Sequence, residues 1–164
     1  LEQFELFLCD YVDLHAFCLL PDHFHLLVRV KQENEVRAFV KPEIKRQTGW
    51  LTRLVSKQFQ RFFQGYAQAI NRQEGRVGSL FQKNFKRRPI TSDAYLTRVI
   101  YYLHLNPVKH RVWDDYRTYP YSSCARILSP RQTRLCKQAV LDWFGGADNY
   151  TKFHEAEIKI DPRA

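Results

Sequence analysis

The sequence predicts an α+β fold in which helices cover one face of an antiparallel sheet. Two short apolar runs, Ala16–Leu20 and Phe24–Val30, flank the turn signal Pro21-Asp22, as is typical of a β-hairpin. Three longer stretches repeat apolar residues at helical spacing and alternate with predicted strands or turns. At 164 residues the chain is long enough for one compact domain with a buried core.

The first half of the chain contains two of these helical stretches. Leu1–Tyr11 predicts an amphipathic helix, and Leu14–Val30 supplies both strands of the hairpin. Lys31–Trp50 is charged and has no clear period, which indicates a mobile loop. Thr52–Arg72 predicts a second, long helix, because its aromatic and aliphatic residues recur on one side and its basic residues lie opposite.

The second half begins with a turn, which a predicted strand at Ser79–Phe85 follows. Asp93–Leu105 predicts a third helix, with Ser92 as its N-cap and Pro107 as its end. This order of elements approaches a ferredoxin-like (split βαβ) antiparallel sheet with helices on one face, which needs one more strand before Leu1. The chain contains no methionine, and we therefore expect it to begin inside a longer product that supplies this strand.

The predicted elements divide the chain into a main part and a short tail. We expect residues 1–124 to form the main domain and residues 125–164 to form a small helical C-terminal extension. In the extension, Leu135–Phe144 predicts a short helix that Gly145 and Gly146 close.

The composition indicates which class of partner the protein binds and in which compartment it acts. Lysine and arginine total 26 against 17 acidic residues, a formal net charge of +9, which favours nucleic acid as the partner but also fits a basic enzyme. No apolar run is long enough to span a bilayer and no signal pattern begins the chain, so we expect a cytoplasmic protein without a membrane partner. The four cysteines lack the paired spacing of a zinc site, which indicates free thiols.

His23 and His25 flank Phe24 at the start of the second predicted strand. Because side chains on a strand alternate between its faces, both imidazoles are expected on one side and Phe24 on the other, in a core. Two imidazoles on one strand face can hold a metal ion. The alternative is a solvated strand face that carries two histidines, and the pair by itself does not decide between them.

The third predicted helix carries a tyrosine in a distinctive position. Its apolar stripe, which is expected to face the core, consists of Leu96, Val99, Ile100 and Leu103. Tyr102 lies at the edge of the stripe and is expected to face the sheet, with Arg98 and Asn106 one turn away, whereas Tyr101 is expected in solvent. A tyrosine at such a position is more often a packing residue than a nucleophile.

Three segments together resemble the REP-associated tyrosine transposases, relatives of the single-strand transposases in the HUH endonuclease superfamily. They are AFCLLPDHFHLLVRV at Ala16–Val30, GSLFQKNFKRR at Gly78–Arg88 and YLHLNPVK at Tyr102–Lys109. A His-hydrophobic-His strand and one catalytic tyrosine on a later helix characterise that family. The resemblance covers most of residues 1–124, including YPYSSC at Tyr119–Cys124.

The resemblance implies a role for each matching residue. His23, His25 and Asn106 would be metal ligands, with Mg²⁺ or Mn²⁺ as the cofactor, and Tyr102 would be the nucleophile. The implied reaction, part of DNA transposition and recombination, cleaves and rejoins DNA hairpins through a 5′-phosphotyrosine intermediate. Asp22 departs from the family pattern, which usually has asparagine there.

Basic residues near these motifs are expected to contact the DNA backbone, which makes binding sensitive to salt. They are Lys83, Lys86, Arg87, Arg88, Arg98, Lys109 and Arg111. The expected partner is single-stranded or hairpin DNA, with a monomer favoured and a dimer as the alternative. Two other functions stay open: a sequence-specific DNA-binding regulator of the same fold that does not cleave, and an RNA-binding module.

Overall fold

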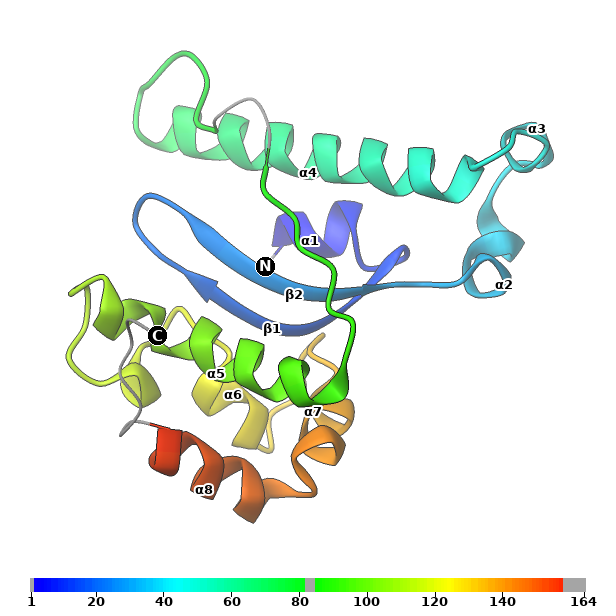
Figure 1. The fold of residues 1–164 in the computed structure, drawn as a ribbon. Coiled ribbons are helices and arrows are strands. Elements are labelled where there is room, and N and C mark those ends of the chain that lie inside the picture. Colours follow the sequence, from blue (N-terminus) through cyan, green and yellow to red (C-terminus); the bar gives the residue numbers. More distant parts are fainter. Residues whose placement is uncertain (1, 82–84, 158–164) are drawn as a thin grey trace. The chain divides into compact units, whose positions relative to one another are not determined.

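A computed structural model of the chain describes residues 2–81 and 85–157 (Figure 1). It confirms the α+β class: in the described part of the chain, two strands form an antiparallel sheet and the other elements are helical. The strands are β1 (Val12–Leu19) and β2 (Phe24–Val30). The helices are α1 (Glu2–Phe7), α2 (Glu33–Val36), η1 (Arg37–Phe39), α3 (Pro42–Lys45), α4 (Trp50–Gln73), α5 (Asp93–Lys109), η2 (Tyr116–Thr118), α6 (Cys124–Leu128), α7 (Lys137–Phe144) and α8 (Ala147–Glu157).

The chain forms two compact units. The first combines residues 1–13 with residues 30–88, and the second combines residues 14–29 with residues 89–164. Each unit is described separately below. Among the described helices, none has the length and apolar character that crossing a membrane requires.

In the first unit, α1 packs against α4. A glycine makes the approach possible, because a Cβ at Gly65 would lie 2.8 Å from the ring of Phe7. The segment expected to be a mobile loop instead forms α2, η1 and α3, so that expectation was wrong. Its apolar residues Val36 and Val40 are buried in a cluster with Trp50, which gives these short helical turns a core of their own.

The predicted strand Ser79–Phe85 is not found in the part that the structure describes; residues 82–84 lie outside it. Phe81 and Phe85 both contact Phe63 of α4, with ring centroids 5.1 and 5.0 Å apart. The aromatic residues of the predicted strand therefore cover a helix. Without this strand, the ferredoxin-like arrangement is not confirmed.

In the second unit, the hairpin packs against helices from the C-terminal half. The backbone N–H of Leu20 donates to the carbonyl of His23 at 2.8 Å and closes the turn between the strands. Below the turn, one core cluster joins the hairpin to α5, α7 and α8. Its buried members on these elements are Ala16, Cys18, Leu27, Ile100, Leu103, Val140, Phe144 and Tyr150.

The free edge of β1 is covered by the segment that precedes α6. Leu19 N–H donates to the carbonyl of Tyr121, and Ser123 N–H donates to the carbonyl of Phe17, each at 2.9 Å. The hydroxyl of Ser123 also accepts the N–H of Phe17 at 2.9 Å. These bonds satisfy backbone groups of β1 that a two-stranded sheet would leave exposed.

Tyr101 is buried, not in solvent as the helical projection suggested. Only 7% of its surface is exposed, and its ring lies 5.6 Å from that of His154 and 6.2 Å from that of Tyr116. The projection treated α5 as a helix with a single buried face. Residues of η2 and α8 cover the opposite face, so Tyr101 belongs to a second small core.

Candidate functional site

The hairpin holds His23 and His25 close together. His23 is the last residue of the turn, His25 is the second residue of β2, and their ring centroids are 5.1 Å apart. Leu27, which shares the strand face of His25, is buried in the core cluster with α5 residues, whereas Phe24 on the other face is only half-buried. The histidines thus lie on the covered face of the strand, and the expectation that Phe24 occupies the core behind them was wrong.

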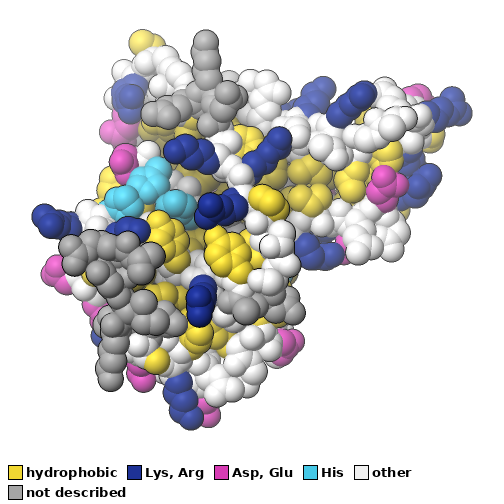
Figure 2. Space-filling view, in the orientation of Figure 1, with side chains coloured by type: hydrophobic (Ala, Val, Ile, Leu, Met, Phe, Trp, Pro, Cys, Tyr) yellow, Lys and Arg dark blue, Asp and Glu magenta, His cyan; other side chains and the backbone are white. Residues whose placement is uncertain are grey.

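A third histidine joins the pair from α5. His110 is the C-cap of this helix, and its ring centroid lies 4.8 Å from that of His23. We call His23, His25 and His110 the three-histidine cluster. Figure 2 shows histidine side chains gathered in one patch on the face in view. The other three histidines of the chain are at least 96% buried.

His110 was missed in the sequence. The residue follows the helical stretch and has no apolar period around it, so nothing in its immediate context singles it out. It lies four residues after Asn106, and its N–H donates to the Asn106 carbonyl at 2.9 Å. The spacing of one helical turn from a candidate ligand is the signal that could have found it.

The environment of His25 favours a neutral ring. Burial lowers the pKa of His25, and the positive charge of a protonated His23 or His110 nearby would lower it further. Its Nε2 atom is buried and has no hydrogen-bond partner among the described residues. A neutral imidazole with a buried nitrogen free of protein partners can bind a cation.

Asp22 fixes the orientation of His23. The carboxylate oxygen Oδ1 lies 2.7 Å from Nδ1 of His23, and this hydrogen bond holds the pKa of Asp22 below its usual range. An ionised carboxylate can only accept, so Nδ1 of His23 carries the proton and donates it. In the neutral ring, Nε2 then keeps the lone pair that a metal ion requires.

Asn106 is oriented by the proline that follows it. The prediction that Pro107 ends the helix was wrong, since α5 continues through Pro107 to Lys109. Proline cannot donate the N–H that the Leu103 carbonyl would receive in a regular helix. The Asn106 side chain compensates, because its Nδ2 donates to the carbonyl of Leu103 at 3.2 Å and to that of Tyr102 at 2.8 Å. With Nδ2 so engaged, Oδ1 is buried without a hydrogen-bond partner in the described part of the chain.

Tyr102 is accessible and lies beside a cation. Its side chain is 46% exposed, and the Lys109 ammonium lies 3.4 Å from the phenol oxygen and 4.6 Å from the ring centroid. The Lys109 ammonium is therefore the cation next to the phenol oxygen. Tyr102 precedes Asn106 by one helical turn, so both project from the same side of α5.

The basic residues expected to contact DNA are divided between the units. In the first unit, Lys86, Arg87 and Arg88 are exposed, and Lys83 lies outside the described residues. In the second unit, Arg98, Lys109 and Arg111 are exposed along α5 and just after it. Arg111 has a φ of 57°, which turns the chain sharply away from the helix. Contact of these residues with DNA stays a prediction.

A second, buried group of side chains could also hold a metal ion. His104, Cys124 and His154 each offer one ligand atom, and these atoms lie within 4.8 Å of one another. The group was missed because its members are far apart in the sequence, and Cys124 was expected to be only a free thiol. Burial raises the pKa of Cys124 to about 11, so a metal ion would have to displace the thiol proton.

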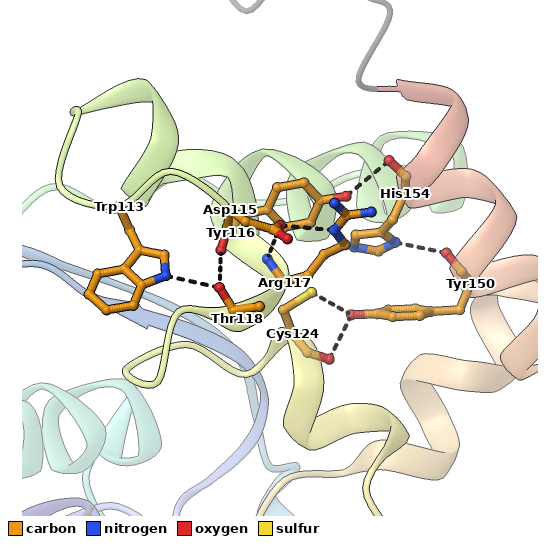
Figure 3. A network of polar contacts seen from close by, with 8 residues as sticks. All are labelled: Trp113, Asp115, Tyr116, Arg117, Thr118, Cys124, Tyr150 and His154. Atoms are coloured by element: carbon orange, nitrogen blue, oxygen red, sulfur yellow. Dashed lines mark hydrogen bonds and ion pairs between the residues drawn. The ribbon is translucent and has the colours of Figure 1, made fainter.

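Without a metal, a chain of hydrogen bonds satisfies the same histidines. The Tyr150 carbonyl can only accept, so Nδ1 of His154, 2.8 Å away, carries a proton. Nε2 of His154 can then accept from Nδ1 of His104 at 3.1 Å, and Nε2 of His104 from the Ser123 hydroxyl at 2.7 Å. Figure 3 shows the neighbouring contacts, in which the Tyr116 hydroxyl donates to the His154 carbonyl. This network ties α5 to α6 and α8.

Comparison with known proteins gives one informative relative. A curated protein of Haemophilus influenzae, named "Putative REP-associated tyrosine transposase", is 32% identical to the chain over 111 residues. The match covers 68% of the chain and 58% of the relative, so the chain spans less than two thirds of that protein. No family model matches the chain, and no solved structure matches it significantly. The relative confirms the resemblance found in the motifs, and the chain belongs to the family of REP-associated tyrosine transposases.

Proposed function

We propose that the protein is a metal-dependent transposase that cleaves and rejoins single-stranded or hairpin DNA as a monomer. One observation carries the proposal. The hairpin that carries His23 and His25 lies against the end of the helix that carries Tyr102, because the rings of His23 and His110 are in contact. The name of the Haemophilus influenzae relative supports the same class of reaction.

The side chains fit a divalent metal ion. His25 Nε2 and Asn106 Oδ1 are both buried and have no hydrogen-bond partner among the described residues. Buried polar atoms normally have a partner, and a bound metal ion would supply one to both. Asp22 leaves Nε2 of His23 as the third donor. We therefore propose His23, His25 and Asn106 as the ligands. When bound, Mg²⁺ or Mn²⁺ would polarise the scissile phosphate and stabilise negative charge in the transition state.

The remaining chemistry belongs to Tyr102. Its phenol oxygen would attack the scissile phosphorus, form a bond to it, and displace the 3′ oxygen of the preceding nucleotide, which leaves as a hydroxyl. The phenol proton passes to solvent, and the Lys109 ammonium offsets the negative charge on the attacking oxygen. One phosphoester replaces another, so the free 3′ hydroxyl can later attack the phosphotyrosine and rejoin the strand without ATP.

The exposed basic residues would position the DNA strand. Arg98 precedes the tyrosine on α5 and Arg111 lies just after this helix, and Lys86, Arg87 and Arg88 add positive charge in the first unit. Contacts of this kind go to phosphates, so they hold the strand without reading its bases.

A denaturing gel with 3′-labelled hairpin DNA tests this function. In the presence of Mn²⁺ we expect a covalent protein–DNA species that is lost in Tyr102→Phe and in EDTA. Tyr121→Phe is the matched control, because Tyr121 is also exposed and lies outside the site. Tight binding of the hairpin with no covalent species in any condition would refute the enzyme and leave the non-cleaving regulator.

A further inference from the structure

We propose that His110 is a third imidazole ligand of the metal ion, which makes the site selective for Mn²⁺, Co²⁺ or Zn²⁺ over Mg²⁺. The proposal rests on the metal site of the proposed function and extends it to a residue outside the motifs of the sequence. It is carried by the spacing of the rings, by the donor atoms that the neighbours leave available, and by the position of His110 at a helix end.

The ring spacing matches that of imidazoles around one ion. A nitrogen bound at about 2.1 Å puts its ring centroid about 3.2 Å from the metal, so rings roughly 90–110° apart have centroids about 4.5–5.2 Å from each other. The observed separations are 5.1 Å for His23 and His25 and 4.8 Å for His23 and His110. The rings are inclined at 88° and 69°, so they meet edge to face and are not stacked in parallel.

The neighbours leave donor atoms available around the cluster. Asp22 occupies Nδ1 of His23, and Nε2 of that ring is left for an ion. Nε2 of His25 and Oδ1 of Asn106 are buried without partners in the described part of the chain.

The backbone holds His110 in place for this role. Its N–H donates to the carbonyl of Asn106, so the two residues occupy successive turns at the end of α5. This helix has 17 residues, and its carboxyl end carries partial negative charge that favours a cation. A ligand at this position needs no rearrangement of the helix.

A third nitrogen donor changes which ion the site prefers. Mg²⁺ prefers oxygen ligands and gives up its water reluctantly, whereas imidazole suits the later divalent metals. The site would then offer three imidazole nitrogens and one amide oxygen. We expect it to bind Mn²⁺ or Co²⁺ at least tenfold more tightly than Mg²⁺. Without His110 only two imidazole nitrogens remain, and the preference for Mn²⁺ and Co²⁺ over Mg²⁺ should decrease.

The test is isothermal titration calorimetry, which measures the affinity of the DNA-free protein for Mn²⁺, Co²⁺ and Mg²⁺. His110→Ala should weaken Mn²⁺ and Co²⁺ binding about 10- to 100-fold and change Mg²⁺ binding much less. His110→Asn, which offers an oxygen instead, should shift the preference toward Mg²⁺. Asp114→Ala, an exposed residue in the segment after α5, is the control for a change near the cluster, and thermal melting shows that each variant is folded.

Pulsed electron paramagnetic resonance of the Mn²⁺-loaded protein counts the bound nitrogens directly. We expect the signal of one imidazole to disappear in His110→Ala. An ion bound by His104, Cys124 and His154 would give the same nitrogen signal in the wild type and in His110→Ala. The difference between the two signals therefore reports on His110 alone. If His110→Ala keeps the full affinity and nitrogen signal while His25→Ala loses them, His110 is not a ligand. If the wild type binds no ion at all, the metal-dependent function itself fails.

Discussion

Asp22 and His23 form a hydrogen-bonded pair, with the carboxylate oxygen 2.7 Å from Nδ1 of the ring. The two residues are adjacent in the chain, and Asp22 remains largely exposed, with 85% of its side chain in solvent. A carboxylate that accepts from a ligand histidine fixes its tautomer and raises its basicity. The residue that departs from the family pattern therefore makes a specific hydrogen bond to His23 in this chain.

Replacement of Asp22 should weaken metal binding without removing it. Asp22→Asn keeps an acceptor but loses the charge, so we expect Mn²⁺ affinity to fall by about tenfold, and Asp22→Ala should lower it further. Calorimetric titration measures both. Asp114→Asn is the control, because this exposed carboxylate lies in the segment after α5 and outside the proposed ligand set. Equal affinities in the wild type and Asp22→Ala would show that the pair does not tune His23.

Asn106 should contribute to stability as well as to metal binding. In Asn106→Ala the carbonyl of Leu103 loses its donor beside Pro107, and we expect the free energy of unfolding to fall by about 1–3 kcal/mol. Urea denaturation without metal measures this loss. Asn149→Ala is the control, because Asn149 also donates to a carbonyl but is exposed, so its loss should be smaller. A negligible change in the stability of Asn106→Ala would show that the hydrogen bond from Asn106 to the Leu103 carbonyl does not stabilise the helix.

The buried histidines predict a loss of stability in acid. Burial lowers the pKa of His154 to about 4 and that of His104 well below its usual value, so both rings are neutral when the protein is folded. Their contribution is fully present above about pH 6.5, the value for an unfolded chain, and is lost as the pH falls toward 4. The unfolded state binds more protons in this range, and His154 alone accounts for on the order of 3 kcal/mol.

Chemical denaturation in EDTA from pH 7.5 to pH 4.5 measures this dependence. His154→Gln removes one titrating group, so its stability should vary less with pH than that of the wild type, whatever its absolute value. Identical slopes in the two proteins would mean that His154 is not a buried neutral ring.

Lys109 should accelerate the attack of Tyr102. Lys109→Gln removes the cation 3.4 Å from the phenol oxygen, and we expect covalent adduct formation to slow by about tenfold or more. Single-turnover kinetics at saturating DNA separate this effect from weaker DNA binding. Lys152→Gln, an exposed lysine on α8, should react at the wild-type rate. A variant of Lys109 with an unchanged single-turnover rate would restrict this residue to DNA binding.

The parts of the site that could be predicted are those that local patterns encode. The turn signal at Pro21-Asp22 placed His23 and His25 on a hairpin, and the helical period placed Tyr102 and Asn106 one turn apart. Both patterns depend on residues near one another in the chain. His110 could not be predicted in this way, because its place in the cluster depends on contact with His23, in a turn almost ninety residues earlier.

The errors in the fold have similar causes. Tyr101 was expected in solvent because the projection of one helix does not reveal that η2 and α8 cover its second face. Pro107 was expected to end the helix, but the Asn106 side chain supplies the missing donor. A strand was predicted at Ser79–Phe85, but in the structure Phe81 and Phe85 pack on Phe63. In each case a tertiary contact overrode the local preference.

The most direct test of the account is mass spectrometry of the protein after reaction with hairpin DNA and Mn²⁺. Digestion with nuclease and protease should leave a peptide whose Tyr102 carries a nucleotide through its 5′ phosphate. The modification should be absent in EDTA. A nucleotide on another tyrosine, such as Tyr95 or Tyr121, or cleaved DNA with no modified residue, would contradict the central claim that Tyr102 is the nucleophile.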